Sequence, residues 1–143
     1  MSTDFTRAAG IQIQIPKSIL TVLNQLYEVE QKLKKSDSPT SIGRNLAKMK
    51  DALAEEGLPG QDYGGGQIRI TLAYEDPMGQ PYKETRTDVE ATVSGDSKEN
   101  LVVVEVIKPI IRATTWKSGE REICKIVQQG IVIVASRKAQ AEP

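Results

Sequence analysis

The order of hydrophobic and polar residues changes character once along this chain. In residues 17–56 apolar residues recur three and four positions apart, with almost no Gly or Pro, which is typical of amphipathic helices. Residues 67–135 carry alternating apolar and polar positions, β-branched runs and most of the turn signals. The pattern predicts an α+β protein, with an N-terminal helical hairpin followed by a small all-β domain.

Two helices account for the first region. Pro16 is compatible with the first turn of a helix that ends near Lys35, because that turn needs no intrahelical N–H. Thr40 or Ser41 can cap a second helix, and Gly57 stands where a left-handed residue would end it. The short polar link between them favours an antiparallel hairpin.

The apolar stripe of this hairpin is narrow. A second copy of the chain could complete it as a four-helix bundle, which makes a homodimer the expected state. The alternative is packing against the β region. The residues expected at the dimer contact are Leu23, Leu26, Ile42, Leu46, Met49 and Leu53.

The second region predicts strands at residues 68–75, 82–93, 101–107, 123–127 and 131–135. Residues 114–120, with the single Trp, are expected to form a loop. Cys124 lies within an apolar strand pattern and is expected to be buried and unreactive. Glycines at 64–66 do not predict a phosphate loop, because the Gly-Lys-Ser/Thr ending is absent and a strand follows.

These patterns divide the chain into five parts. Residues 1–16 form an N-terminal arm with a short alternating strand at 11–15, and residues 17–58 form the helical dimerisation hairpin. Residues 59–67 are a linker, residues 68–136 are the β domain, and residues 137–143 are a flexible tail.

The amino-acid composition disfavours several classes of function. The 143 residues include 19 Lys and Arg and 19 Asp and Glu, so the chain has no net positive charge that would attract nucleic acid or an anionic membrane. There is no His, and there is one Cys, which removes the commonest catalytic base and most metal ligands. We therefore expect no catalytic residues, metal or cofactor. The absence of an apolar stretch near 18 residues favours a cytoplasmic protein.

Several segments match one known family. Residues 18–26 look like a Leu-hydrophobic-Pro-Val-hydrophobic-Asp-Asn-Leu segment, and residues 46–58 look like a short second helix ended by glycine. Glu90-Ala91, residues 103–109 and residues 131–135 are similar to parts of the same family's β domain. Over residues 18–135 the chain resembles GrpE, the nucleotide exchange factor of DnaK-type chaperones.

The resemblance implies a function without catalysis. In that family the β domain binds the opened ATPase domain of the chaperone like a wedge, and ADP is released, which requires only preference for the open state. On this basis we expect a homodimer that binds a DnaK-type ATPase domain. The residues expected to contact it are Lys108, Arg112, Trp116 and Arg121.

The departures from the family leave other functions open. Val89 stands where the family has His, Ile110-Ile111 replaces Gly-Tyr, and the long N-terminal coiled-coil helix is absent. One alternative is a non-catalytic assembly or scaffold protein that keeps the fold and binds another client. A third hypothesis, an enzyme that uses Asp76, Glu84, Asp88 and Glu90, is disfavoured because charges alternating along a strand indicate a solvated face.

Overall fold

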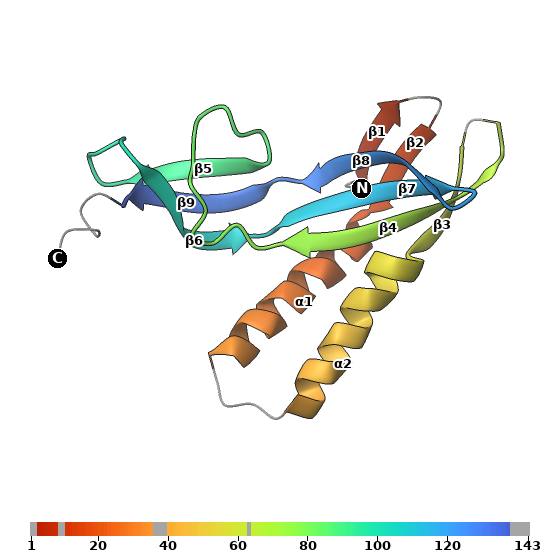
Figure 1. Ribbon diagram of the computed structural model, residues 1–143, viewed down its shortest axis with the longest axis horizontal. Coiled ribbons are helices and arrows are strands. Elements are labelled where there is room, and N and C mark those ends of the chain that lie inside the picture. The colour runs from red at the N-terminus through yellow and green to blue at the C-terminus, as the bar shows by residue number, and fades with distance from the viewer. Residues whose placement is uncertain (1–2, 9–10, 36–39, 63, 138–143) are drawn as a thin grey trace. The chain divides into compact units, whose positions relative to one another are not determined.

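The computed structural model describes residues 3–8, 11–35, 40–62 and 64–137, with backbone alone for 3–8, 11–14 and 40. The chain forms two compact units (Figure 1). Unit 1 contains residues 1–74 and 111–127, and unit 2 contains residues 75–110 and 128–143. Each unit is therefore assembled from separate stretches of the sequence.

Unit 1 combines two helices with most of the strands. Strands β1 (Thr3–Ala8) and β2 (Ile11–Pro16) pair with each other and lead into helix α1 (Lys17–Lys34). Helix α2 (Thr40–Asp51) continues into a π-helical turn, η1 (Ala52–Glu56). The main sheet has the order β3-β4-β7-β8, with β3 Leu58–Gln61, β4 Gln67–Glu75, β7 Ile110–Lys117 and β8 Glu120–Gln128.

Helix α1 lies on one face of this sheet (Figure 1), and its apolar residues pack into the core there. Leu23 is 1% exposed and belongs to the same core as Ile70, Leu72 and Ile111. Leu53, at the end of the second helix, packs against that core. Every second residue of a strand points to the same face, so the apolar residues that alternate along β4 all point toward this core. Helices and sheet thus share one core.

The expected fold class is wrong. Most of the regular secondary structure is strand, a strand pair precedes the helices, and the sequence is not divided into an N-terminal helical hairpin and a following all-β domain. No four-helix bundle is needed within the described residues, because the sheet already covers the apolar stripe of α1. The alternative of packing against the β region is the one observed. The spacing of the apolar residues is compatible both with a bundle formed by two copies and with packing on the sheet, so the sequence pattern did not distinguish these arrangements.

The individual helix predictions are confirmed, including the end of the second helix. Gly57 has a φ of +69°, and its N–H donates to the Ala52 carbonyl oxygen at 2.8 Å. A Cβ at this position would lie 2.1 Å from the carbonyl oxygen of Ile70. Glycine is therefore required here for two reasons, the left-handed backbone and the close approach of β4.

Unit 2 is built on a three-stranded sheet of order β5-β9-β6. Its strands are β5 (Val89–Ser94), β6 (Leu101–Lys108) and β9 (Gly130–Ser136). The central strand β9 pairs in parallel with β5 and antiparallel with β6. Val103, Val132 and Val134 are at most 2% exposed and form the centre of its apolar interior.

Two segments that the sequence predicts as a loop and a linker contain strand residues instead. Trp116 lies in β7, and the turn is confined to Ser118 and Gly119, whose φ angles are both positive. β-Branched Thr114 and Thr115 and the aromatic Trp116 favour the extended backbone, which explains the longer strand. Residues 59–67, expected to be a linker, include most of β3. Apart from Arg137, the expected tail lies outside the described residues.

Candidate binding surfaces

The face of the unit 1 sheet opposite the core carries a basic and aromatic group of residues. Ile68 and Ile70 of β4 and Ile111 and Ala113 of β7 point into the core. Their sequence neighbours point to the opposite face, because side chains alternate along a strand. We name this surface the Arg–Trp face; it consists of Arg69, Thr71, Arg112, Thr114 and Trp116.

The Trp116 side chain is fixed on this face by its neighbours. Its indole Nε1–H donates to Thr71 Oγ1 at 2.8 Å, and Thr71 Oγ1 donates to the Thr114 carbonyl oxygen at 3.4 Å. The Arg69 guanidinium lies 5.6 Å from the centre of the Trp116 ring, within cation–π range. The ring is half-buried while Arg69 is exposed, so an ordered aromatic and a cation are both accessible.

The four residues expected to contact a chaperone do not form one group. Arg112 and Trp116 are four positions apart on β7 and share the Arg–Trp face. Arg121 is exposed on β8, also in unit 1, whereas Lys108 is exposed at the end of β6 in unit 2. Arg69 was missed by the sequence analysis, although its place in the alternating segment 68–75 puts it on the face of that strand opposite the apolar residues.

The expected dimer residues are divided by burial. Leu23, Leu26 and Leu46 are at most 7% exposed in the single chain, so they are not available to a second copy. Leu53 is half-buried against the unit 1 core. Ile42 and Met49 remain 47% and 49% exposed. A dimer contact through all six residues is therefore incompatible with this packing.

A polar cluster joins the two helices to β4. Lys50 Nζ lies 2.8 Å from Glu30 Oε2 and 5.0 Å from the centre of the Tyr74 ring, which packs edge-to-face on Tyr27. Partial burial alone would raise the pKa of Glu30, but the hydrogen bond and charge of Lys50 outweigh it and lower this pKa. Burial raises the pKa of Tyr74, and the charge of Glu30 raises it further. These shifts follow from packing and identify a structural contact.

The glycine-rich segment folds around Asp62. Asp62 Oδ1 accepts hydrogen bonds from the N–H groups of Gly64 and Gly66 at 3.0 and 2.8 Å, and Asp62 Oδ2 lies 2.5 Å from Lys117 Nζ. The hydrogen bonds from Lys117 and then from Gly66 lower the pKa of Asp62. Two N–H groups that a phosphate would need are thus occupied by the chain's own carboxylate.

The prediction that Cys124 is buried is wrong. The residue is exposed on β8, the last strand in its sheet order. Ile123 and Val127 of the same strand contribute to the core, so alternation directs Cys124 to the opposite face. The apolar neighbours made burial plausible, but they cover only one face of the strand.

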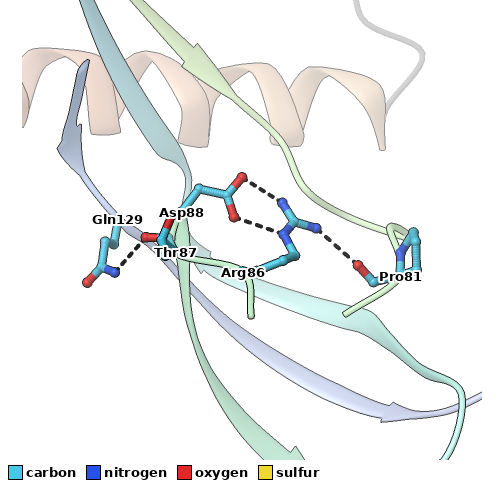
Figure 2. A network of polar contacts seen from close by, with 5 residues as sticks. All are labelled: Pro81, Arg86, Thr87, Asp88 and Gln129. Carbon is cyan, nitrogen blue, oxygen red and sulfur yellow. Dashed lines mark hydrogen bonds and ion pairs between the residues drawn. The ribbon is translucent and has the colours of Figure 1, made fainter. Parts of the chain in front are cut away.

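The connection between β4 and β5 in unit 2 is ordered by its own polar contacts. Figure 2 shows the Arg86 guanidinium between the Asp88 carboxylate and the Pro81 carbonyl oxygen. Both Asp88 oxygens accept from Arg86 at 2.8 Å, and Arg86 Nη1 donates to Pro81 O at 3.1 Å. Gln129 Nε2 donates to the Thr87 carbonyl oxygen at 2.9 Å. Residues 83–88, expected as part of a strand with a solvated face, are instead a loop stabilised by paired charges.

A cleft of about 750 Å³ lies beside this loop in unit 2. Its lining comes from three places: the loop, strand β5, and the end of the turn that leads into β6. The sequence analysis missed it because the loop and β5 are brought together only by tertiary contacts.

The comparisons assign no family to the chain. No family model, curated protein or solved structure matches it. None of the helices in the described ranges is long and apolar enough to cross a membrane.

Proposed function

We propose that this chain is a non-catalytic binding protein that docks an acidic segment of a partner protein on the Arg–Trp face. The observation that carries the proposal is the Nε1–H hydrogen bond of 2.8 Å that holds Trp116 on Thr71, beside Arg69. Trp and Arg are the residue types most enriched at interface hot spots. A side chain already ordered in the free protein loses little conformational entropy when it binds.

Charge supports an acidic partner. The Arg69 guanidinium lies beside the Trp116 ring and is exposed, while the whole chain has no net charge. A cation beside an ordered aromatic ring favours a partner segment of opposite charge, because complementary charge raises association rates and disfavours cationic partners. This proposal develops the assembly hypothesis and does not depend on the expected four-helix bundle.

The test is quantitative capture from a lysate of the source organism, followed by binding to the purified partner. We expect Trp116→Ala to weaken binding about 30-fold, the size of a hot-spot residue, and Arg69→Gln to weaken it less and reduce its salt dependence. Lys48→Gln, an exposed change on α2, is the matched control. The near-ultraviolet circular dichroism of each variant checks folding. A partner that binds all variants equally would contradict the proposal.

The exchange function implied by the GrpE resemblance stays a separate prediction, as do the homodimer and the cytoplasmic location. A DnaK-type ATPase domain loaded with a fluorescent ADP analogue tests it directly. Faster release with the wild-type chain, lost in Trp116→Ala and Arg112→Ala, would support exchange. Unchanged release would reject exchange and leave the capture experiment to decide about other partners.

A further inference from the structure

The cleft in unit 2 has the size and composition of a small-molecule site. Its volume of about 750 Å³ falls within the usual range for ligand pockets, roughly 300–1,000 Å³. Ala91 and Val93 of β5 and Leu101 of β6 give it an apolar lining. Val93 is 37% exposed, which leaves an apolar side chain partly uncovered.

The wall of the cleft is preformed. Residues 79–82 pair with β6, since Tyr82 N–H donates to Leu101 O at 2.8 Å and Val103 N–H donates to Gln80 O at 2.9 Å. The Arg86–Asp88 pair then holds the rest of the loop (Figure 2). A wall fixed before binding reduces the entropy lost when a ligand is ordered against it.

The polar lining of the cleft is cationic on balance. Lys83 comes from the loop and Lys98 from the turn before β6, and Glu84 is the one acidic residue in the lining. Within the described residues neither lysine is in an ion pair, so both ammonium groups can face a ligand. Tyr82 and Asn100 add hydrogen-bonding groups beside the apolar residues.

We propose that this cleft binds a small amphipathic anion, with a short apolar chain against Val93 and Leu101 and a carboxylate near Lys83 and Lys98. An uncharged apolar molecule would leave both ammonium groups unused, and a cation would be repelled by them. The site lies wholly in unit 2, so it is separate from the Arg–Trp face and does not depend on the function proposed for that face.

Octanoate is the probe, and octan-1-ol, which has the same chain length without the charge, is its matched control. In a ¹H–¹⁵N NMR titration of the full chain we expect octanoate to shift amides of Ala91, Val93 and Asn100 in a saturable way. Octan-1-ol should bind the same residues more weakly. Together, Lys83→Gln and Lys98→Gln should weaken octanoate about ten-fold and leave octan-1-ol unchanged, since each exposed charge contact is worth up to about five-fold.

Two further variants separate specific binding from general adsorption. Val93→Asp should abolish binding of both probes, because it places a charge in the apolar lining, and Val93 is exposed enough for the fold to survive. Lys48→Gln on α2 should change nothing. Shifts that are scattered over unit 1, equal affinities for the two probes, or an unchanged octanoate affinity in the double lysine variant would each overturn the assignment.

Discussion

The two units cover their sheets by different means. In unit 1 an amphipathic helix supplies the second layer, and Leu23 enters a core that includes Ile15, Ile70 and Ile111. In unit 2 the described residues between β4 and β5 form a loop, which is held in place by the ion pair between Arg86 and Asp88. A helix is held in place by its backbone hydrogen bonds instead. A helix presents a continuous apolar stripe, whereas a loop presents few apolar side chains. This difference explains why the cleft lies beside the loop of unit 2.

A large effect is expected at the junction between the second helix and strand β3 of unit 1. Gly57→Ala should lower the free energy of unfolding by roughly 2–4 kcal/mol, because it combines a left-handed backbone with a clash against β4. Gly43→Ala is the matched control, since nothing lies within 4 Å of its added Cβ and Ala favours a helix. Chemical denaturation measures both. A Gly57→Ala protein as stable as wild type would show that this junction is not rigid.

Core truncations compare the two interiors. Leu23→Ala should lower the free energy of unfolding by about 2–5 kcal/mol and Val134→Ala by about 1–3 kcal/mol, since valine loses less volume. The exposed neighbour Val22→Ala should change it by less than about 0.5 kcal/mol. Urea denaturation gives the values.

Hydrogen exchange then tests whether the units open separately. In Val134→Ala we expect faster exchange of the Val103 amide in unit 2 and unchanged exchange of the Ile70 amide in unit 1. Equal acceleration at both amides would mean that the two interiors unfold as one cooperative unit.

A smaller effect is expected from the loop of unit 2. Arg86→Gln removes the bidentate pair with Asp88, and about 1 kcal/mol should be lost, because both side chains are only about one-fifth exposed. Arg86→Lys should restore only part of this loss, since an ammonium group cannot make the same two parallel bonds. Lys83→Gln, in the same loop but without an ion pair among the described residues, is the control. Comparable stability of Arg86→Gln and Lys83→Gln would show that the Arg86–Asp88 pair does not stabilise the loop.

The smallest effect concerns the Asp62 turn in unit 1. Because Lys117 and the Gly66 N–H lower the pKa of Asp62, its NMR titration should show a midpoint below the ordinary 3.8. The stabilising contact is complete above that ordinary value and is lost as the pH falls through the lowered pKa. Lys117→Gln should move the midpoint upward, and Lys48→Gln should not. A midpoint that does not respond to Lys117→Gln would contradict the contact.

Local signals in the sequence were sufficient for most secondary structure. The helix from 17, the glycine that ends the second helix and the strand after residue 100 were all predicted, because period, capping and β-branching act within a few residues. Cys124 was misplaced because a strand with apolar residues can still have one accessible face. Trp116 was misplaced because the turn signals at Ser118 and Gly119 were extended too far back along the chain. Arg69 could have been found from alternation in the segment 68–75, whereas the cleft beside β5 could not.

The sequence by itself determined where the two helices and the cores of most strands lie, and which of their faces are apolar. Only the tertiary structure decided what those faces meet. Leu23 could have packed against a second copy or against β4, and the difference is a contact between residues about 50 positions apart that no local pattern encodes. The same reason applies to function, because Arg69 and Trp116 become one surface only when β4 and β7 lie side by side.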